Sequence, residues 1–165
     1  LVGSEMCIRD RVETEADGGT KTDTHDFGKN DVLSIPQGWN WTGRSSDIYK
    51  STTTPVALVE SGAPVLKMAK DQVTLTSEIY AGEITKISFW LVANSTSANI
   101  KSILDVQARS DADAEWTTVL SVDNVNAYEG RGAQLSADVP AGMHQLRFVY
   151  TKPQAGGNVL SLIHI

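Results

Sequence analysis

Hydrophobic and polar residues alternate along most of the chain from residue 26 onward. The run ITKISFWLV, from Ile84 to Val92, sets isoleucine, phenylalanine and leucine at alternate positions. In the run ILDVQARS, from Ile103 to Ser110, the polar positions hold Asp105, Gln107 and Arg109. Successive side chains of a β-strand point to opposite faces, so this period of two predicts strands with one buried face and one face in water.

Further runs of this kind, separated by turn-forming residues, bring the expected total to about eight strands. They are Trp116 to Val122, His144 to Tyr150, Val32 to Ile35, Pro64 to Met68, Gln72 to Thr76 and Gln134 to Val139. No stretch keeps a helical period long enough for a sustained helix. Short strands at this spacing predict an all-β fold, an antiparallel β-sandwich.

The sandwich is expected to occupy residues 26–159 as one module, without an internal repeat. Residues 12–25 read VETEADGGTKTDTH, and so polar a segment is predicted to be a linker.

The two ends of the chain are related at the level of DNA. Codons for Glu5 to Asp10, with the first two bases of the next codon, can be chosen so that their reverse complement encodes LSLIHI, the sequence of residues 160–165. This DNA resembles the mosaic-end adapter of transposase-based sequencing libraries. We therefore expect residues 1–11 and 160–165 to be adapter-derived artefacts, and residues 12–159 to be an interior fragment of a longer gene.

Composition and charge exclude several classes of function. The chain has 165 residues, of which 41% are hydrophobic, and these values fit one globular domain. Its 14 Lys and Arg residues are scattered among 20 Asp and Glu residues, so the sequence offers no electrostatic track for nucleic acid. No apolar run approaches the roughly 20 residues of a membrane span.

No catalytic motif is evident in the sequence. The one cysteine, Cys7, lies in the segment attributed to the adapter, and outside the two ends the histidines are His25 and His144, far apart along the chain. There is no nucleophile elbow, zinc-binding helix motif or phosphate-binding glycine-rich loop. We therefore predict no enzyme, no catalytic residue and no cofactor.

Acidic residues alternate in the segment that holds Asp111, Asp113 and Glu115. Oxygen ligands at this spacing could bind Ca²⁺, although the helix–loop–helix calcium motif is excluded because Trp116 stands where that motif needs glycine. The alternative, which we favour, is a hairpin turn between the flanking strands with Trp116 packed beneath it.

The candidate ligand-binding residues are Trp39, Trp41 and Arg44 of the segment GWNWTGR, together with Tyr49. Aromatic rings stack on sugar rings, while neighbouring arginine and asparagine side chains bond to hydroxyl groups. We expect one of the two tryptophans in the core and the other exposed.

Several short segments occur in a characteristic order. They are DF at 26–27, GW at 38–39, PVLK at 64–67, ISFW at 87–90, EWTTV at 115–119, QLRFVYTK at 145–152 and GNV at 157–159. This series resembles the jelly-roll modules of secreted Bacteroidetes proteins, of the choice-of-anchor J and cleaved-adhesin type, which are similar in outline to MAM-like sandwiches. The resemblance implies a jelly-roll sandwich in an extracellular or cell-surface protein.

In such modules a final strand with paired acidic residues can help to bind Ca²⁺, and calcium is therefore an expectation for the full-length module. Here residues 160–165 stand in place of that strand. Because Leu160, Ile163 and Ile165 are apolar, we predict that this segment pairs as a strand in the vacant position.

Three functions remain open at this stage. The first is a non-catalytic accessory module that binds a carbohydrate or another ligand, such as a surface protein, and is fused to other domains in the full gene. The second is a structural spacer next to a catalytic domain, which burial of both Trp39 and Trp41 would favour. The third is a fragment of a glycan-active enzyme, which would need two facing carboxylates.

Overall fold

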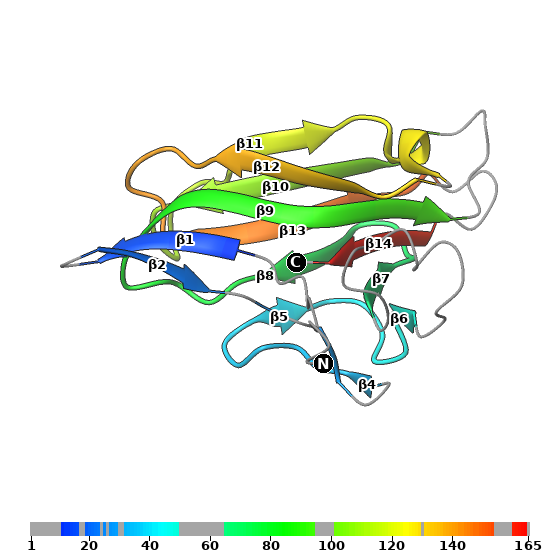
Figure 1. Cartoon of the computed structure of the whole chain (residues 1–165), viewed down its shortest axis with the longest axis horizontal. Coiled ribbons are helices and arrows are strands. Elements are labelled where there is room, and N and C mark those ends of the chain that lie inside the picture. The colour runs from blue at the N-terminus through cyan, green and yellow to red at the C-terminus, as the bar shows by residue number, and fades with distance from the viewer. Residues whose placement is uncertain are drawn as a thin grey trace, which may run out of the picture.

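The computed structural model describes residues 11–16, 19–23, 25, 27–29, 32–49, 65–94, 101–129, 131–153 and 160–164. Most of them form the strands of two antiparallel β-sheets that pack face to face (Figure 1). Within these ranges the helical content is one 3₁₀ turn, η2 (Val125–Tyr128). The fold is an antiparallel β-sandwich, as the alternating pattern predicts, of the jelly-roll type that the resemblance implies.

One sheet has five strands. Their order is β11 (Thr117–Val122), β10 (Ile103–Arg109), β13 (Gln145–Thr151), β8 (Val73–Thr76) and β5 (Asn40–Trp41). Buried and partly exposed residues alternate along β10, and Asp105, Gln107 and Arg109 lie on the partly exposed side, as predicted. This sheet gives one face to the core and keeps the other face polar.

The second sheet is organised around the long strand β9 (Glu83–Asn94). β9 pairs with both β1 (Arg11–Ala16) and β14 (Leu160–His164). Beyond β1 lies β2 (Gly19–Asp23), and beyond β14 lie β7 (Val65–Met68) and then β6 (Ile48–Tyr49). β1 pairs with residues 83–88 of β9, and β14 with residues 90–94. The two strands therefore follow one another along one edge of β9 (Figure 1), and β12 (Ala133–Asp138) pairs with the other edge.

The strand predicted for the C-terminal segment is confirmed. Leu162 of β14 lies opposite Val92 of β9 on one side and Lys67 of β7 on the other. β14 is thus an interior strand that satisfies backbone donors and acceptors of two neighbours, which an open edge would leave without partners.

The prediction of a linker over residues 12–25 is wrong, because most of this segment forms two strands. β1 and β2 pair with each other as a hairpin, and β1 adds this hairpin to β9. Thr14 is 4% exposed and belongs to the buried side. β-Branched threonines fit a pleated sheet well, so backbone pairing forms strands here despite the scarcity of apolar residues.

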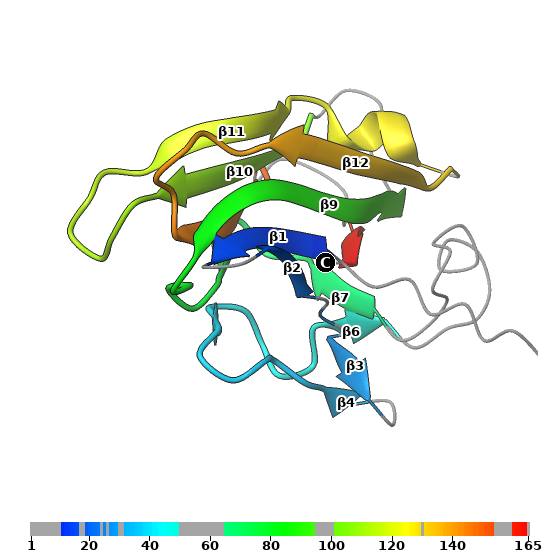
Figure 2. The same ribbon diagram turned by 60° about the vertical axis from the view of Figure 1, so that its left-hand side comes forward.

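The other predicted strands agree with observed ones to within one or two residues. Val32 to Ile35 is reduced to β4 (Val32–Leu33), which pairs with β3 (Gly28–Lys29) in a small ribbon below the sandwich (Figure 2). The very short strands β5 and β6 were not predicted, because two residues are too few to show a period.

The hydrophobic core lies between the two sheets. Phe89 of β9 meets Phe148 of β13 edge to face, with ring centroids 5.4 Å apart. Both rings are almost completely buried. The described part of the chain contains no helix long and apolar enough to cross a membrane.

Candidate functional site

The two tryptophans of the predicted ligand loop differ in burial. Trp39 is 7% exposed, and its ring contacts those of His25 and Phe27, with centroid distances of 4.7 and 5.6 Å. The Trp39 ring, a candidate for ligand contact, is thus used in packing. Trp41 is partly exposed, so the two tryptophans differ in burial, as expected.

Trp41 and Arg44 belong to one tight loop. The Trp41 indole N–H donates to the Arg44 carbonyl oxygen at 3.2 Å, and the Arg44 N–H donates to Asp47 Oδ2 at 2.7 Å. Gly43 lies so close to the Trp41 ring that a Cβ atom there would collide with it. The Arg44 residue is exposed, whereas the Tyr49 side chain lies outside the described residues and only its pairing with Val65 is defined.

The acidic segment forms a hairpin turn, which is the favoured alternative. β10 and β11 pair as predicted, and Asp111 Oδ1 accepts the N–H groups of Asp113 and Ala114 at 2.9 and 3.0 Å. These bonds, led by that from Asp113, lower the pKa of Asp111. Asp113 and Glu115 are exposed. Among the described residues no group of His, Cys, Asp or Glu side chains is arranged to hold a metal ion, so the calcium expectation for these three residues gains no support.

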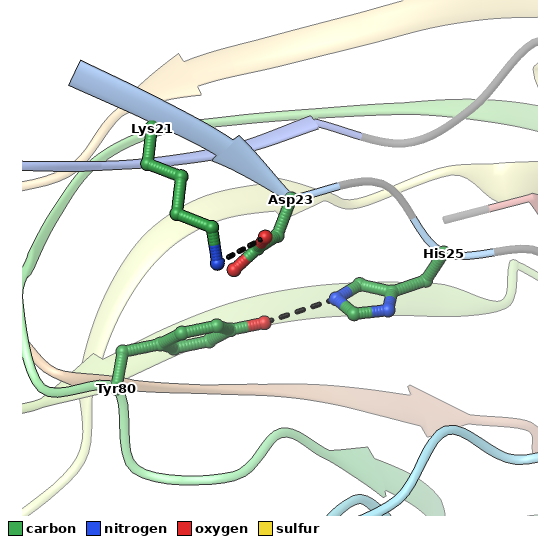
Figure 3. A network of polar contacts seen from close by, with 4 residues as sticks. All are labelled: Lys21, Asp23, His25 and Tyr80. Atoms are coloured by element: carbon green, nitrogen blue, oxygen red, sulfur yellow. Dashed lines mark hydrogen bonds and ion pairs between the residues drawn. The ribbon is translucent and has the colours of Figure 1, made fainter.

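A polar cluster ties the N-terminal hairpin to the loop between β8 and β9 (Figure 3). Lys21 and Asp23 form an ion pair at 2.8 Å, and His25 Nε2 lies 3.1 Å from the Tyr80 hydroxyl oxygen. Burial is the main cause that lowers the pKa of His25 and raises that of Tyr80. Both groups are therefore uncharged at neutral pH. Their contact joins the segment that follows β2 to the loop between β8 and β9.

The polar composition of residues 12–25 predicts a linker and gives no sign of this cluster. The available signal was the sequence ADGG, a hairpin-turn pattern, between two threonine-containing runs.

The outward side of the five-stranded sheet, here called the outer face, carries a continuous row of polar side chains. Strand register places one hydrogen-bonding residue of each strand side by side across the sheet. This polar row consists of Thr118, Gln107, Arg147, Thr76 and Asn40, all partly or fully exposed. At about 4.8 Å between strands, the row extends over roughly 19 Å.

Trp116 lies on the outer face beside the polar row. The Cζ atoms of Arg109 and Arg147 are each 4.4 Å from the centroid of its ring. Trp116, predicted to pack beneath the hairpin turn, packs on these two guanidinium groups, and Arg109 is itself bonded to the Ala112 carbonyl oxygen of that turn. The alternation places Arg109 on the polar side, but the three residues come from separate segments whose register no local pattern gives.

A cavity of about 380 Å³ lies between β11, η2 and β12. Among the described residues its lining includes Tyr128, Asn124 and one carboxylate, that of Asp123. The described lining therefore does not offer the pair of facing carboxylates that glycoside hydrolysis requires.

No protein-family model matches the chain, and no curated protein matches it. Solved structures that share its fold include three cleaved adhesin domains of Lys-gingipain. The K1 domain, from Porphyromonas gingivalis W83, has a TM-score of 0.52 and 15% identity, covering 78% of this chain and 88% of that domain. For the K2 domain the TM-score is 0.51 and the identity 14%, over 78% of this chain and 90% of the other.

The K3 domain, also from Porphyromonas gingivalis W83, has a TM-score of 0.50 and 12% identity, covering 82% of this chain and 95% of that domain. At such low identities, the likeness establishes the fold alone. The chain has the β-sandwich fold that these cleaved adhesin domains share.

Proposed function

We propose that this chain is a non-catalytic accessory module of a secreted or cell-surface bacterial protein, and that its outer face binds a carbohydrate. The observation that carries the proposal is the polar row, which lines up hydrogen-bonding side chains of five strands beside the partly exposed Trp116. The adhesin domains that share the fold support an adhesive role.

The outer face suits an extended ligand better than the predicted loop does. Side chains on a sheet are held at fixed spacing by the strands, so they meet a ligand without a large loss of conformational freedom. In the loop, Trp39 is buried and the indole N–H of Trp41 is already bonded to Arg44. We therefore propose the outer face as the main site and leave Trp41 and Arg44 as an alternative site.

The structural spacer remains the second candidate function. Of the two tryptophans whose burial would favour it, Trp39 is buried and Trp41 is partly exposed. A spacer needs no ligand, and its polar side chains would then serve only solubility. Fusion to other domains is part of both proposals.

Binding to a carbohydrate array tests the proposal directly. The whole chain is compared with the variants Trp116→Ala and Trp41→Ala, after thermal melting has shown that each variant is folded. We expect Trp116→Ala to weaken binding at least tenfold, because it removes the ring that holds Arg109 and Arg147 in place. Trp41→Ala serves as the matched control and is expected to bind like the unchanged chain.

Loss of binding in Trp41→Ala alone would move the site to the loop. Absence of binding to every carbohydrate on the array would favour the structural spacer.

A further inference from the structure

The outer face holds two neighbouring cations that have no carboxylate partner among the described residues. Arg109 lies opposite Gln145, and Arg147 lies opposite Gln107, two residues further along the same pair of strands. Ion pairing in the described part of the chain involves Lys21 and Asp23, and neither of these arginines. On a chain of net charge −6, two adjacent cations with no ion-pair partner in the described part of the chain are a distinctive local feature.

Neutral groups hold both guanidinium groups in place. Arg109 Nε donates to Gln145 Oε1 and Arg147 Nε donates to Gln107 Oε1, each at 2.6 Å. The two amides are fixed in turn, because Gln145 Nε2 donates to the Ser77 carbonyl oxygen at 2.7 Å and Gln107 Nε2 donates to Thr118 Oγ1 at 3.4 Å. The Trp116 ring adds a contact to each cation.

These contacts leave several N–H groups available. A guanidinium group has five N–H donors. Arg147 uses the one on Nε, and Arg109 uses those on Nε and one on Nη1, which is bonded to the Ala112 carbonyl oxygen. The terminal nitrogens of Arg147 and Nη2 of Arg109 have no hydrogen-bond partner among the described residues, and they lie on a partly exposed face.

The electrostatics of the pair favour an anion. Burial, and secondarily the charge of Arg109, lower the pKa of Arg147, so the two cations oppose each other. Arg109 contributes to lowering the pKa of Asp111, but that carboxylate is already bonded to the N–H groups of its own turn. An anionic group bound between the arginines would relieve their repulsion.

We propose that the carbohydrate bound by the outer face is an acidic polysaccharide, and that Arg109 and Arg147 bind the carboxylate groups of its uronic acid residues. This inference rests on the proposed function, because it names the ligand class of the same face. A carboxylate matches the planar fork of a guanidinium group and can accept two N–H bonds from it. The hydroxyl groups of the same sugar chain would then form hydrogen bonds with the amide groups and the threonine hydroxyl groups of the polar row.

The test uses the full chain with sodium polygalacturonate, neutral galactan and dextran sulfate as probes, in isothermal titration calorimetry at 50 and 500 mM NaCl. We expect polygalacturonate to bind at least tenfold more tightly than galactan at low salt. Its affinity should fall as the salt concentration rises, because ions screen the attraction.

Arg147→Gln should weaken binding of polygalacturonate at least tenfold. Arg131→Gln is the matched control, since Arg131 also stacks on an aromatic ring, that of Tyr128, but lies away from the outer face. Arg147→Lys keeps the charge and loses the fork. It should bind with intermediate affinity, and it replaces the glutamine variant if that variant does not fold.

The outcomes separate the two proposals. Binding of galactan but not of polygalacturonate, with loss in Trp116→Ala, would overturn the acidic ligand and keep the carbohydrate-binding face. Tighter binding of dextran sulfate than of polygalacturonate would overturn the assignment to carboxylates. Equal weakening by Arg147→Gln and Arg131→Gln would show unspecific attraction and overturn the arginine site. Binding of no probe, and of no carbohydrate on the array, would overturn both proposals.

Discussion

At the scale of single residues, His25 has an unusual environment for a residue in so polar a segment. Its ring lies against the buried Trp39 ring and its Nε2 atom is 3.1 Å from the Tyr80 hydroxyl oxygen. Burial lowers the pKa of His25 below its ordinary value of 6.5, although the carboxylates of Asp23 and Glu78 act in the opposite direction. The folded state therefore favours the neutral imidazole.

We expect the free energy of unfolding to decrease as the pH falls below 6.5. In this range the unfolded chain binds a proton at His25 while the folded chain does not, so the unfolded state binds more protons and stability rises with pH. The contribution is complete above 6.5 and is lost as the pH falls toward the lowered pKa. Urea denaturation at pH 7.5 and 5.5 measures it.

The variant His25→Gln removes this titration and should show a smaller difference between the two pH values. Equal differences in the variant and the unchanged chain would contradict the assignment to His25.

At the scale of elements, β14 and the hairpin of β1 and β2 complete the larger sheet. β14 has a partner on both sides, and β1 lies between β2 and β9. Interior strands contribute backbone hydrogen bonds to two neighbours, so their loss affects more of the sheet than the loss of an edge strand.

Leu162→Pro is expected to destabilise the fold by at least about 1–3 kcal/mol, the cost of leaving a backbone partner without its hydrogen bond. Proline cannot donate a backbone hydrogen bond and is poorly tolerated within a sheet, and Leu162 lies between Val92 and Lys67. Thermal unfolding followed by circular dichroism measures the change. Leu162→Ile keeps both the N–H group and the apolar character, and it should melt near the unchanged chain. Equal melting temperatures for the proline and isoleucine variants would show that β14 adds little to the sheet.

Strands with one apolar face could be predicted from sequence, and the site could be predicted only in part. β10 and β13 place their apolar side chains in one core, so their period is visible in the residues. The hairpin of β1 and β2 carries threonine and charged residues in its strands, and this composition hides the period. The arginine pair depends on the register of β10 against β13, which no local pattern specifies.

At the scale of the whole molecule, cohesion of the sandwich depends on contacts between the two sheets. Phe89 and Phe148 meet at an interplanar angle of 88°, an edge-to-face arrangement in which the positive edge of one ring points at the negative face of the other. This pair couples β9 to β13, the strand that carries Arg147.

Phe89→Ala and Phe148→Ala should each destabilise the fold by about 3–5 kcal/mol, because each leaves a cavity in the core. The double variant should be less destabilised than the sum of the two by about 0.5–1.5 kcal/mol, the usual value of such an aromatic pair. Urea denaturation of the four proteins gives this difference. Val32→Ala, at a side chain that is 63% exposed, is the control and should change stability by less than about 0.5 kcal/mol. Strictly additive effects would mean that the two rings do not interact.

The arrangement of β1 and β14 along β9 also determines which chain connections the sandwich tolerates. Arg11 lies opposite Ser88 and His164 opposite Trp90, so the end of β14 and the start of β1 are about 7 Å apart along the same strand. A short linker between residues 164 and 11 would join them into one continuous strand. If the chain were then opened at the exposed turn of Asp111 and Asp113, the circular permutant should form the same pairs of strands. The positions of the two chain ends are therefore not essential to the pairing of the strands, and they can be moved to another turn.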